Sequence, residues 1–436
     1  MKEKLVAILL HFYQPYWQFP EYVIRAIEKS YIPVSRAILK SEINLTVNIT
    51  SCLLEREDEF PRLKEFRENI GEAANNGKIE FTHSSAYHAF FPMLEQYPWE
   101  IQRQIELNAE KSREIFGGTW NARGLFSPEM GISPSVLKLA RALGISWTIA
   151  DAPVYDFRPK LGQTIPYNLI LGVEGLPLFF RSQDWSDNLS QRDRAHKLHG
   201  LNLEMYAHKL YEAIDFWVNN SSGYIIIAMD GETFGEHINE YTEDNLKSLF
   251  QTLFHLKDLR LATLSELVET FPIHNLGIEW EHDFKGSWST SVENLREGIA
   301  YPLWSNPHNN LHSLQWALTY SAIEATKLTE DFVQEHKVPE NMMISYQESR
   351  VILDRALNSC QYWWAARGFH GTSEDKARVA TIIHTNAFDL WQLLVNNFLL
   401  LIASNANLES RRKIFEIKND ADKAFSAIDE IVSPYL

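Results

Sequence analysis

Two acids stand directly after an apolar run in the string GYIIIAMDGETFGEH. Residues 223–228 form a short, uninterrupted run that is rich in isoleucine, which predicts a strand buried on both faces. Asp230 and Glu232 follow it at a spacing of two, beside Gly231 and Gly235, which allow the backbone to turn sharply. Paired acids at such a point suit acid–base or nucleophilic chemistry, in which one acid keeps its proton and the other stays ionised.

Further polar residues lie within or at the ends of other apolar runs. They are His11, Glu80, His83, Tyr87, His88, Glu129, Asp151, Arg181, Asp184 and His237. One acid at a strand end is usually a turn former or a helix cap, and both Asp230 and Glu129 stand where such a role is possible. Turn formation alone does not explain acids at three successive strand ends with aromatic residues beside them. Two acids without a metal-ligand set suit glycoside hydrolysis, in which one carboxylate attacks the anomeric carbon and the other acid protonates the leaving oxygen.

The 13 tryptophans also favour a sugar site, because the apolar face of a pyranose ring stacks on a flat aromatic side chain. Four of them are predicted to line the cleft: Trp288, Trp304, Trp363 and Trp364. Trp316 and Trp391 lie on apolar stripes with helical spacing and are predicted to pack in a core.

Strand-like runs and helical patterns alternate through the first part of the chain, and the spacing of Val23, Ile24, Ile27 and Ile32 predicts a helix over residues 21–40. The predicted strands cover residues 4–12, 43–50, 78–87, 124–131, 146–151, 176–180, 223–230 and 260–264. Strands that alternate with helices pair in parallel, and seven or eight of them favour a closed barrel over an open sheet. Because function gathers at the carboxyl ends of parallel strands, we expect the polar residues above to lie at one mouth.

The pattern becomes helical after about residue 272. Long helical segments are predicted over residues 312–328, 344–368, 375–403 and 409–432. The sequence therefore predicts a catalytic barrel over residues 1–272 and a helical domain over residues 273–436 that contributes aromatic residues to the cleft.

The composition narrows the choice of partners. A formal net charge of −16 argues against a nucleic acid or an anionic membrane surface. Cys52 and Cys360 provide neither a disulfide framework nor a metal–thiolate motif. The N-terminal apolar run is too short for a signal peptide, and we find no uninterrupted apolar stretch that would cross a membrane. We expect a cytoplasmic protein that acts on an oligo- or polysaccharide and uses neither a cofactor nor a metal.

Four strings, taken in order, resemble a known family. HFYQP, GKIEFTHSSAYHAFFPML, GLFSPEM and MDGETFG are similar to the signatures of glycoside hydrolase family 57, and GSWS, YPLW and NSCQYWWA extend the similarity into the helical part. That family comprises α-amylases, amylopullulanases, 4-α-glucanotransferases, branching enzymes and some α-galactosidases. The resemblance implies an α/β fold with an incomplete seven-stranded (β/α) barrel, a C-terminal α-helical bundle, and a retaining mechanism on α-glucans or related α-glycosides.

The resemblance also implies roles for individual residues. Glu129 would be the nucleophile and Asp230 the general acid/base. The implied substrate contacts are His11, Gln14, Glu80, His88, Glu232, Trp288, Trp304, Trp363 and Trp364. Retention requires the two carboxyl groups to lie about 5–5.5 Å apart. Glu232 is expected to supply a negative charge or a hydrogen bond that keeps Asp230 protonated.

Two positions depart from the family pattern, and two other functions stay open. Tyr13 stands where many relatives have a histidine, and Cys360 where an aspartate often precedes the aromatic residues, so sugar specificity cannot be carried over. A metal-dependent enzyme of the polysaccharide deacetylase or α-mannosidase kind would hold a divalent ion with histidines such as His83, His88 and His237. A non-catalytic glycan-binding member of the family would keep the cleft without turnover.

Overall fold

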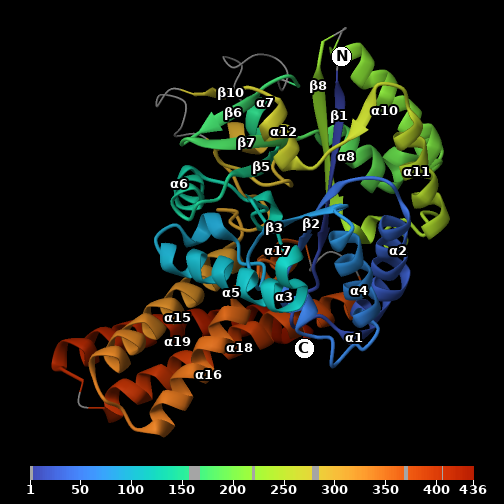
Figure 1. The fold of residues 1–436 in the computed structure, drawn as a ribbon. Coiled ribbons are helices and arrows are strands. Elements are labelled where there is room, and N and C mark those ends of the chain that lie inside the picture. Colours follow the sequence, from blue (N-terminus) through green and yellow to red (C-terminus); the bar gives the residue numbers. More distant parts are fainter. Residues whose placement is uncertain (1–2, 157–166, 219–220, 277–283, 368–371, 405) are drawn as a thin grey trace. The chain divides into compact units, whose positions relative to one another are not determined.

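The computed structural model describes residues 3–156, 167–218, 221–276, 284–367, 372–404 and 406–436. It contains two compact units, Met1–Ala300 and Tyr301–Leu436 (Figure 1). The first unit continues beyond residue 272, where the sequence places the boundary, because strand β10 (Ile273–Asn275) pairs with a strand of that unit. The predicted boundary is therefore too early by one strand and the segment that follows it.

The first unit is built on seven parallel strands in the order β7-β5-β4-β3-β2-β1-β8. Their bounds are β1 (Lys4–Phe12), β2 (Leu45–Ile49), β3 (Ile79–His83), β4 (Gly124–Leu125), β5 (Trp147–Asp151), β7 (Leu176–Arg181) and β8 (Gly223–Asp230). At the two ends of this order, Ser182 N after β7 donates to Ile226 O of β8 at 2.8 Å. The sheet thus curls into a barrel with an incomplete seam, which confirms the predicted fold class.

Three short strands complete the sheet. β6 (Ile170–Val173) runs antiparallel to β7, β10 is parallel to β6, and β9 (Leu259–Leu261) is parallel to the start of β1.

Strand β8 shows why the apolar run folds as predicted. Its residues from Gly223 to Met229 are buried. Ile225, Ile227 and Met229 pack in the core that the surrounding helices share, whereas Tyr224, Ile226 and Ala228 pack in a second, inner core. A strand with apolar surroundings on both faces needs apolar side chains at every position, so its sequence does not alternate.

Helices surround the barrel (Figure 1). They are α1 (Pro20–Ala26), π-helix η1 (Ile27–Tyr31), α2 (Ile32–Lys40), α3 (Ser51–Leu54), α4 (Leu63–Asn75), α5 (Pro98–Phe116), α6 (Pro134–Ala142), α7 (Ala152–Asp156), α8 (Gln183–Ser190), α9 (Arg192–His199), α10 (Leu203–Val218), α11 (Glu243–His255), α12 (Leu264–Thr270) and α14 (Val292–Arg296). Within the described residues of this unit, four short 3-10 turns lie between them: η2 (Phe91–Leu94), η3 (Gly117–Thr119), η4 (Pro128–Met130) and η6 (Gly231–Thr233). Glu129, one of the predicted catalytic acids, lies in η4, and the other, Asp230, directly precedes η6.

The second unit is a helical bundle, as predicted. It contains α15 (Asn310–Glu335), α16 (Glu340–Ala356), α17 (Cys360–Arg367), α18 (Ser373–Ala403), α19 (Leu408–Val432) and the short turn η7 (Ser433–Tyr435). Trp316 stacks on Tyr362 with ring centroids 3.9 Å apart, which confirms that Trp316 packs in a core.

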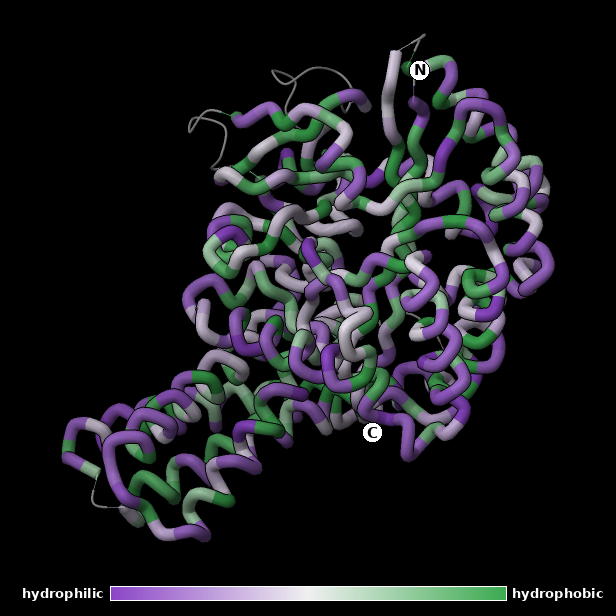
Figure 2. The backbone as a smooth tube through the Cα atoms, viewed as in Figure 1, coloured by the Kyte–Doolittle hydropathy of each residue, from purple (hydrophilic) through white to green (hydrophobic). Residues whose placement is uncertain are grey.

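Helix α18 is longer and more apolar than the sequence analysis allowed for. By length and composition alone it could cross a membrane, and 39% of its most apolar window is buried. It packs against α15, α16 and α19, as a core helix of a bundle does. In Figure 2, polar and apolar residues are interspersed along these helices.

Candidate active site

A cluster of four rings stands at the carboxyl end of β1. His11 stacks on Phe126 with centroids 4.8 Å apart and on His88 at 4.9 Å, and Tyr13 stacks on His88 at 4.0 Å, with its centroid 6.0 Å from that of His11. The Nδ1 of His11 lies 2.6 Å from Oδ1 of Asn48 on β2. Burial lowers the pKa of His11 and lowers that of His88 further. The two imidazoles are therefore neutral at neutral pH and can serve as hydrogen-bonding surfaces.

Glu129 lies beside this ring cluster on the turn that follows β4. Its Oε1 is 3.7 Å from Nδ1 of His88, and its Oε2 accepts a hydrogen bond from Nε1 of Trp288 at 2.8 Å. A second bond, from Trp288 N to Glu129 O at 3.0 Å, fixes the two backbones together. Glu129 has φ +60°, and Met130 has φ +50°. Two consecutive non-glycine residues in the left-handed region are strained, and such strain concentrates at functional sites.

Asp230 ends β8 next to β1, where it pairs in register with His11. The turn that it opens is tight: a Cβ at Gly231 would lie 2.2 Å from the Phe12 ring. The chain therefore needs glycine after Asp230. Asp230 is half-buried, and its charge acts on His11, Glu232 and other neighbours.

Glu232 is buried behind Asp230. Its Oε1 accepts hydrogen bonds from the Tyr31 hydroxyl and from Nε2 of Gln14, the latter at 2.8 Å. Burial, together with the negative charge of Asp230, raises the pKa of Glu232 to about 8. The raised pKa favours the protonated form of Glu232 at neutral pH, and the negative charge that the sequence analysis expects it to supply stays a prediction. The alternative, that it acts on Asp230 through a hydrogen bond, stays a prediction.

Arg181 closes the site on the side of β7. Its guanidinium is buried and pairs with Asp151, at 2.7 Å, and with Asp187, at 3.2 Å. It also donates to the carbonyl of Ala228 on β8 at 3.1 Å and lies 5.8 Å above the Trp288 ring. Arg181 therefore ties the two strands at the barrel seam to the tryptophan that holds Glu129.

These contacts connect the two predicted catalytic acids through shared neighbours. His11 pairs in register with Asp230, and its ring centroid lies 6.1 Å from that of Trp288, which binds Glu129. The structure thus brings together His11, Gln14, His88, Glu129, Asp230, Glu232 and Trp288 at one end of the barrel.

A sequence profile of glycosyl hydrolase family 57 matches residues 4–278, which is more than half of the chain. The chain belongs to glycoside hydrolase family 57. This assignment confirms the resemblance and makes the protein an enzyme of the glycosidase or glucanotransferase kind. A search of curated protein sequences finds no match.

Solved structures give the same family fold. A branching enzyme from Pyrococcus horikoshii aligns with a TM-score of 0.70 at 16% identity, over 100% of this chain and 97% of its own. An alpha-amylase from Thermotoga maritima aligns with a TM-score of 0.67 at 15% identity, over 96% of this chain and 97% of its own. A 4-alpha-glucanotransferase from Thermococcus litoralis aligns with a TM-score of 0.64 at 15% identity, over 93% of this chain and 60% of its own. Identities this low show the fold of this family 57 enzyme and leave its bond specificity open.

Glu80 does not join the cluster at the mouth. It lies on the second residue of β3, and its carboxylate accepts hydrogen bonds from Ser265 N at 3.1 Å, from the Ser265 hydroxyl and from the Thr46 hydroxyl at 3.2 Å. Ser265 is the second residue of helix α12, so the carboxylate lies at a helix N-terminus, where a negative charge is favoured. The position expected for a substrate contact is thus a structural one in this family 57 chain.

The histidines proposed as metal ligands do not share one pocket. His83 packs edge-on against Trp120 with centroids 5.0 Å apart and lines a different cavity, between α5 and α6. His237 is exposed on the turn after β8, whereas His88 is buried in the ring cluster. Two other polar residues at strand ends also point elsewhere: Asp184 is exposed, and the Tyr87 hydroxyl donates to Glu55.

Three tryptophans of the predicted cleft belong to the second unit. Trp304 is fully buried, Trp364 is nearly so, and Trp363 is 37% exposed. Their contact with substrate, like that of Cys360, stays a prediction. Of the two departures from the family pattern, Tyr13 has a defined place, since its ring covers His88.

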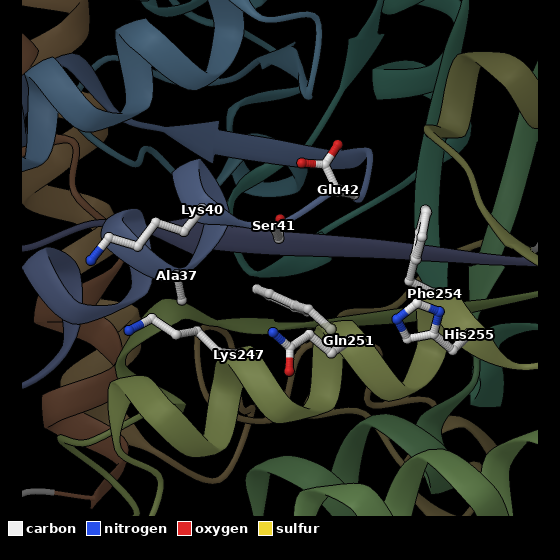
Figure 3. Close-up of a pocket in the computed structure, with 9 residues that line it drawn as sticks. Ala37, Lys40, Ser41, Glu42, Lys247, Gln251, Phe254 and His255 are labelled. Carbon is white, nitrogen blue, oxygen red and sulfur yellow. The ribbon is translucent and has the colours of Figure 1, made fainter.

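A surface pocket of about 340 Å³ lies apart from these residues, between α2 and α11 (Figure 3). Lys40 and Lys247 stand at one end of it, and Phe254 and His255 at the other. Since none of the strand-end acids lines it, we do not assign it to the family 57 reaction.

The sequence gives little indication of the residues that support the acids. Tyr31 lies in a predicted helix as one of several large residues, and Phe126 and Asn48 belong to predicted strands. Only their spatial contacts with Glu232 and His11 reveal their place in the site.

Proposed function

We propose that this enzyme cleaves or transfers α-glucan chains by a retaining mechanism, with Glu129 as nucleophile and Asp230 as general acid/base. One observation carries the proposal: Glu129 is held in a strained conformation by Trp288 and His88, within one network that also contains Asp230. The printed activities of the solved relatives, branching enzyme, alpha-amylase and 4-alpha-glucanotransferase, support α-glucans as the substrate class.

The first half of the reaction forms a covalent intermediate. A carboxylate oxygen of Glu129 attacks the anomeric carbon, and the bond from that carbon to the glycosidic oxygen breaks while the oxygen takes a proton from Asp230. Trp288 holds one oxygen of Glu129 through its indole N–H, which leaves the other oxygen on the side of His88. The neutral imidazoles place no positive charge beside the nucleophile that would weaken its attack.

The second half returns the enzyme to its starting state. Asp230 takes a proton from water or from a sugar hydroxyl, whose oxygen then attacks the anomeric carbon and releases Glu129. Each half inverts the anomeric centre, so the product keeps the α configuration. Water as acceptor gives hydrolysis, and a sugar hydroxyl gives transfer.

The test is a Glu129→Ala variant assayed on maltooligosaccharides, pullulan, starch and α-galactosides, with the product anomers followed by NMR. We expect the wild type to release α products from one of the glucans. We expect the variant to lose turnover by a factor of about 10⁴ or more, and azide to restore part of it as a β-glycosyl azide. Full activity in Glu129→Ala, or β products from the wild type, would contradict the proposal.

A further inference from the structure

The first helical segment changes its winding beside the acidic turn. Helix α1 runs into the π-helix η1 (Ile27–Tyr31), and α2 continues directly from it. A π-helix is rare, and when it occurs within an α-helix it is frequently found at a functional site. The residues of this π-turn contact the chain just after Asp230.

Successive residues of the π-turn each contact the turn that follows Asp230. The Ser30 hydroxyl donates to the carbonyl of Gly231 at 2.7 Å, and the Tyr31 hydroxyl donates to Glu232. Gly235 has φ +94°, and a Cβ there would lie 2.0 Å from the carbonyl oxygen of Lys29. The π-turn therefore fixes the backbone that carries Glu232 as well as its carboxyl group.

The Tyr31 hydroxyl can satisfy Glu232 in either protonation state. It lies 3.1 Å from the carbonyl oxygen of Tyr13 and accepts a hydrogen bond from Nε2 of Gln14 at 3.1 Å. When Glu232 is ionised, the hydroxyl donates to it. When Glu232 carries a proton on Oε1, Glu232 donates to the hydroxyl, and the hydroxyl donates to the carbonyl of Tyr13. Both states are hydrogen-bonded without a change of geometry.

We propose that Tyr31 is a positioning residue that lets Glu232 store and release the proton that Asp230 uses. This inference rests on the proposed function of Asp230. Besides burial, four groups act on Glu232: the charge of Asp230 on β8, the Tyr31 hydroxyl, the backbone N–H of Glu232 itself and the Gln14 amide. Arg181 and His11 interact with the charge of Asp230 instead.

Glu232 and Asp230 together release one proton and regain one proton in each catalytic cycle. With a pKa of about 8, Glu232 carries a proton at neutral pH. As the glycosidic bond breaks, this proton passes to Asp230 and from it to the leaving oxygen, so that both acids are ionised. The water or sugar hydroxyl that attacks next returns one proton to Asp230, and from there to Glu232.

The first measurement does not depend on turnover. We would follow the side-chain carboxyl carbons of ¹³C-labelled glutamate by NMR against pH, and assign Glu232 from the signal lost in Glu232→Gln. We expect a midpoint near pH 8 in the wild type. Tyr31→Phe should raise it by about one pH unit, because the ionised form loses a donor. Gln14→Leu should raise the titration midpoint of Glu232 for the same reason. This variant replaces Tyr31→Phe in the experiment if Tyr31→Phe does not fold.

Tyr206→Phe is the matched control. Tyr206 is also buried, but its hydroxyl donates to the backbone carbonyl of Trp185 at 2.9 Å, so its loss should leave the midpoint unchanged. A wild-type midpoint in the ordinary glutamate range, or an unchanged midpoint in both Tyr31→Phe and Gln14→Leu, would overturn the inference.

The second measurement is the pH profile of kcat/KM. We expect the basic limb in Tyr31→Phe to move up with the NMR midpoint. If Tyr31→Phe loses activity by the same factor at every pH, and the basic limb of its profile does not move, Tyr31 has only a structural role. If Glu129→Ala keeps full activity, the proposed function fails by itself while the NMR experiment still decides the titration of Glu232.

Discussion

The barrel mouth holds ionisable side chains whose charges are set by burial and by close partners. Burial keeps His11 and His88 neutral by lowering the pKa of each imidazole, and it raises the pKa of Glu232. Asp151 is also buried, and burial raises its pKa, but the guanidinium of Arg181 opposes that shift. The same loss of water therefore has opposite consequences for charge, depending on whether a partner of opposite sign is present.

Asp230→Asn should slow turnover on natural glucans by roughly 10²–10⁴-fold, because the leaving oxygen loses its proton donor. The loss should be much smaller for aryl α-glucosides with acidic phenol leaving groups, which depart without a proton. The ratio of kcat/KM for the two substrate types measures this difference. An equal loss on both types would remove Asp230 from the role of acid.

Asp151→Asn should lower the free energy of unfolding by about 3 kcal/mol, because it leaves the buried charge of Arg181 with a weaker set of partners. Urea denaturation at neutral pH measures the change. Asp184→Asn is the control, since the Asp184 side chain is 86% exposed and pairs with Arg194 at 3.6 Å. We expect Asp184→Asn to lower the free energy of unfolding by less than about 1 kcal/mol. Equal changes in the two variants would contradict the importance of the buried pair.

At the element scale, the π-turn is the main difference between prediction and structure. The helical spacing of residues 21–40 predicts one helix, whereas the structure has α1, η1 and α2 in succession. The extra residue in the π-turn fits Ser30, Tyr31 and the Lys29 carbonyl against the turn after β8. Because contacts about 200 residues away in the chain favour this winding, local spacing could not predict it.

Gly235→Ala should disturb this fit. The added methyl would lie 2.0 Å from the Lys29 carbonyl, in a backbone conformation of φ +94° that alanine disfavours. We expect a loss of more than about 2 kcal/mol in unfolding free energy, together with a lower kcat, since the turn carries Asp230. Gly144→Ala is the matched control, because Gly144 has φ +79° with nothing within 4 Å. The backbone strain in Gly144→Ala should lower the free energy of unfolding by about 1 kcal/mol and leave kcat unchanged.

At the scale of the whole molecule, each of the two units has its own fold. The barrel unit extends to Ala300 because β10 pairs with β6 and Trp288 binds Glu129. The string GSWS, which the sequence assigns to the helical part, therefore belongs with the barrel. Hydrophobic periodicity marks where helices begin but not which unit a loop joins, since loops carry no periodic signal.

The stability of the whole protein should depend on pH through Glu232. Its folded pKa, about 8, lies above the unfolded value, so its contribution to stability is complete below pH 4 and is lost as the pH rises to about 8. The wild type should therefore lose stability relative to Glu232→Gln by roughly 1.4 kcal/mol per pH unit between pH 5 and pH 8. Urea denaturation of both proteins at four pH values measures the difference, since other titrating groups cancel. A constant difference across that range would show that Glu232 titrates normally.

The sequence by itself determined the family, the alternation of strands and helices, and the two acids, of which one follows β4 and the other ends β8. Those features depend on local patterns: apolar runs, turn glycines and ordered motifs. Only the tertiary structure decided which polar residues meet. It moved Glu80 to a helix N-terminus, set Trp288 on Glu129, and placed Tyr31 on Glu232. Whether a buried side chain faces water, a charge or a hydroxyl is decided by neighbours far away in the chain. The charge that it carries therefore could not be inferred from its sequence position.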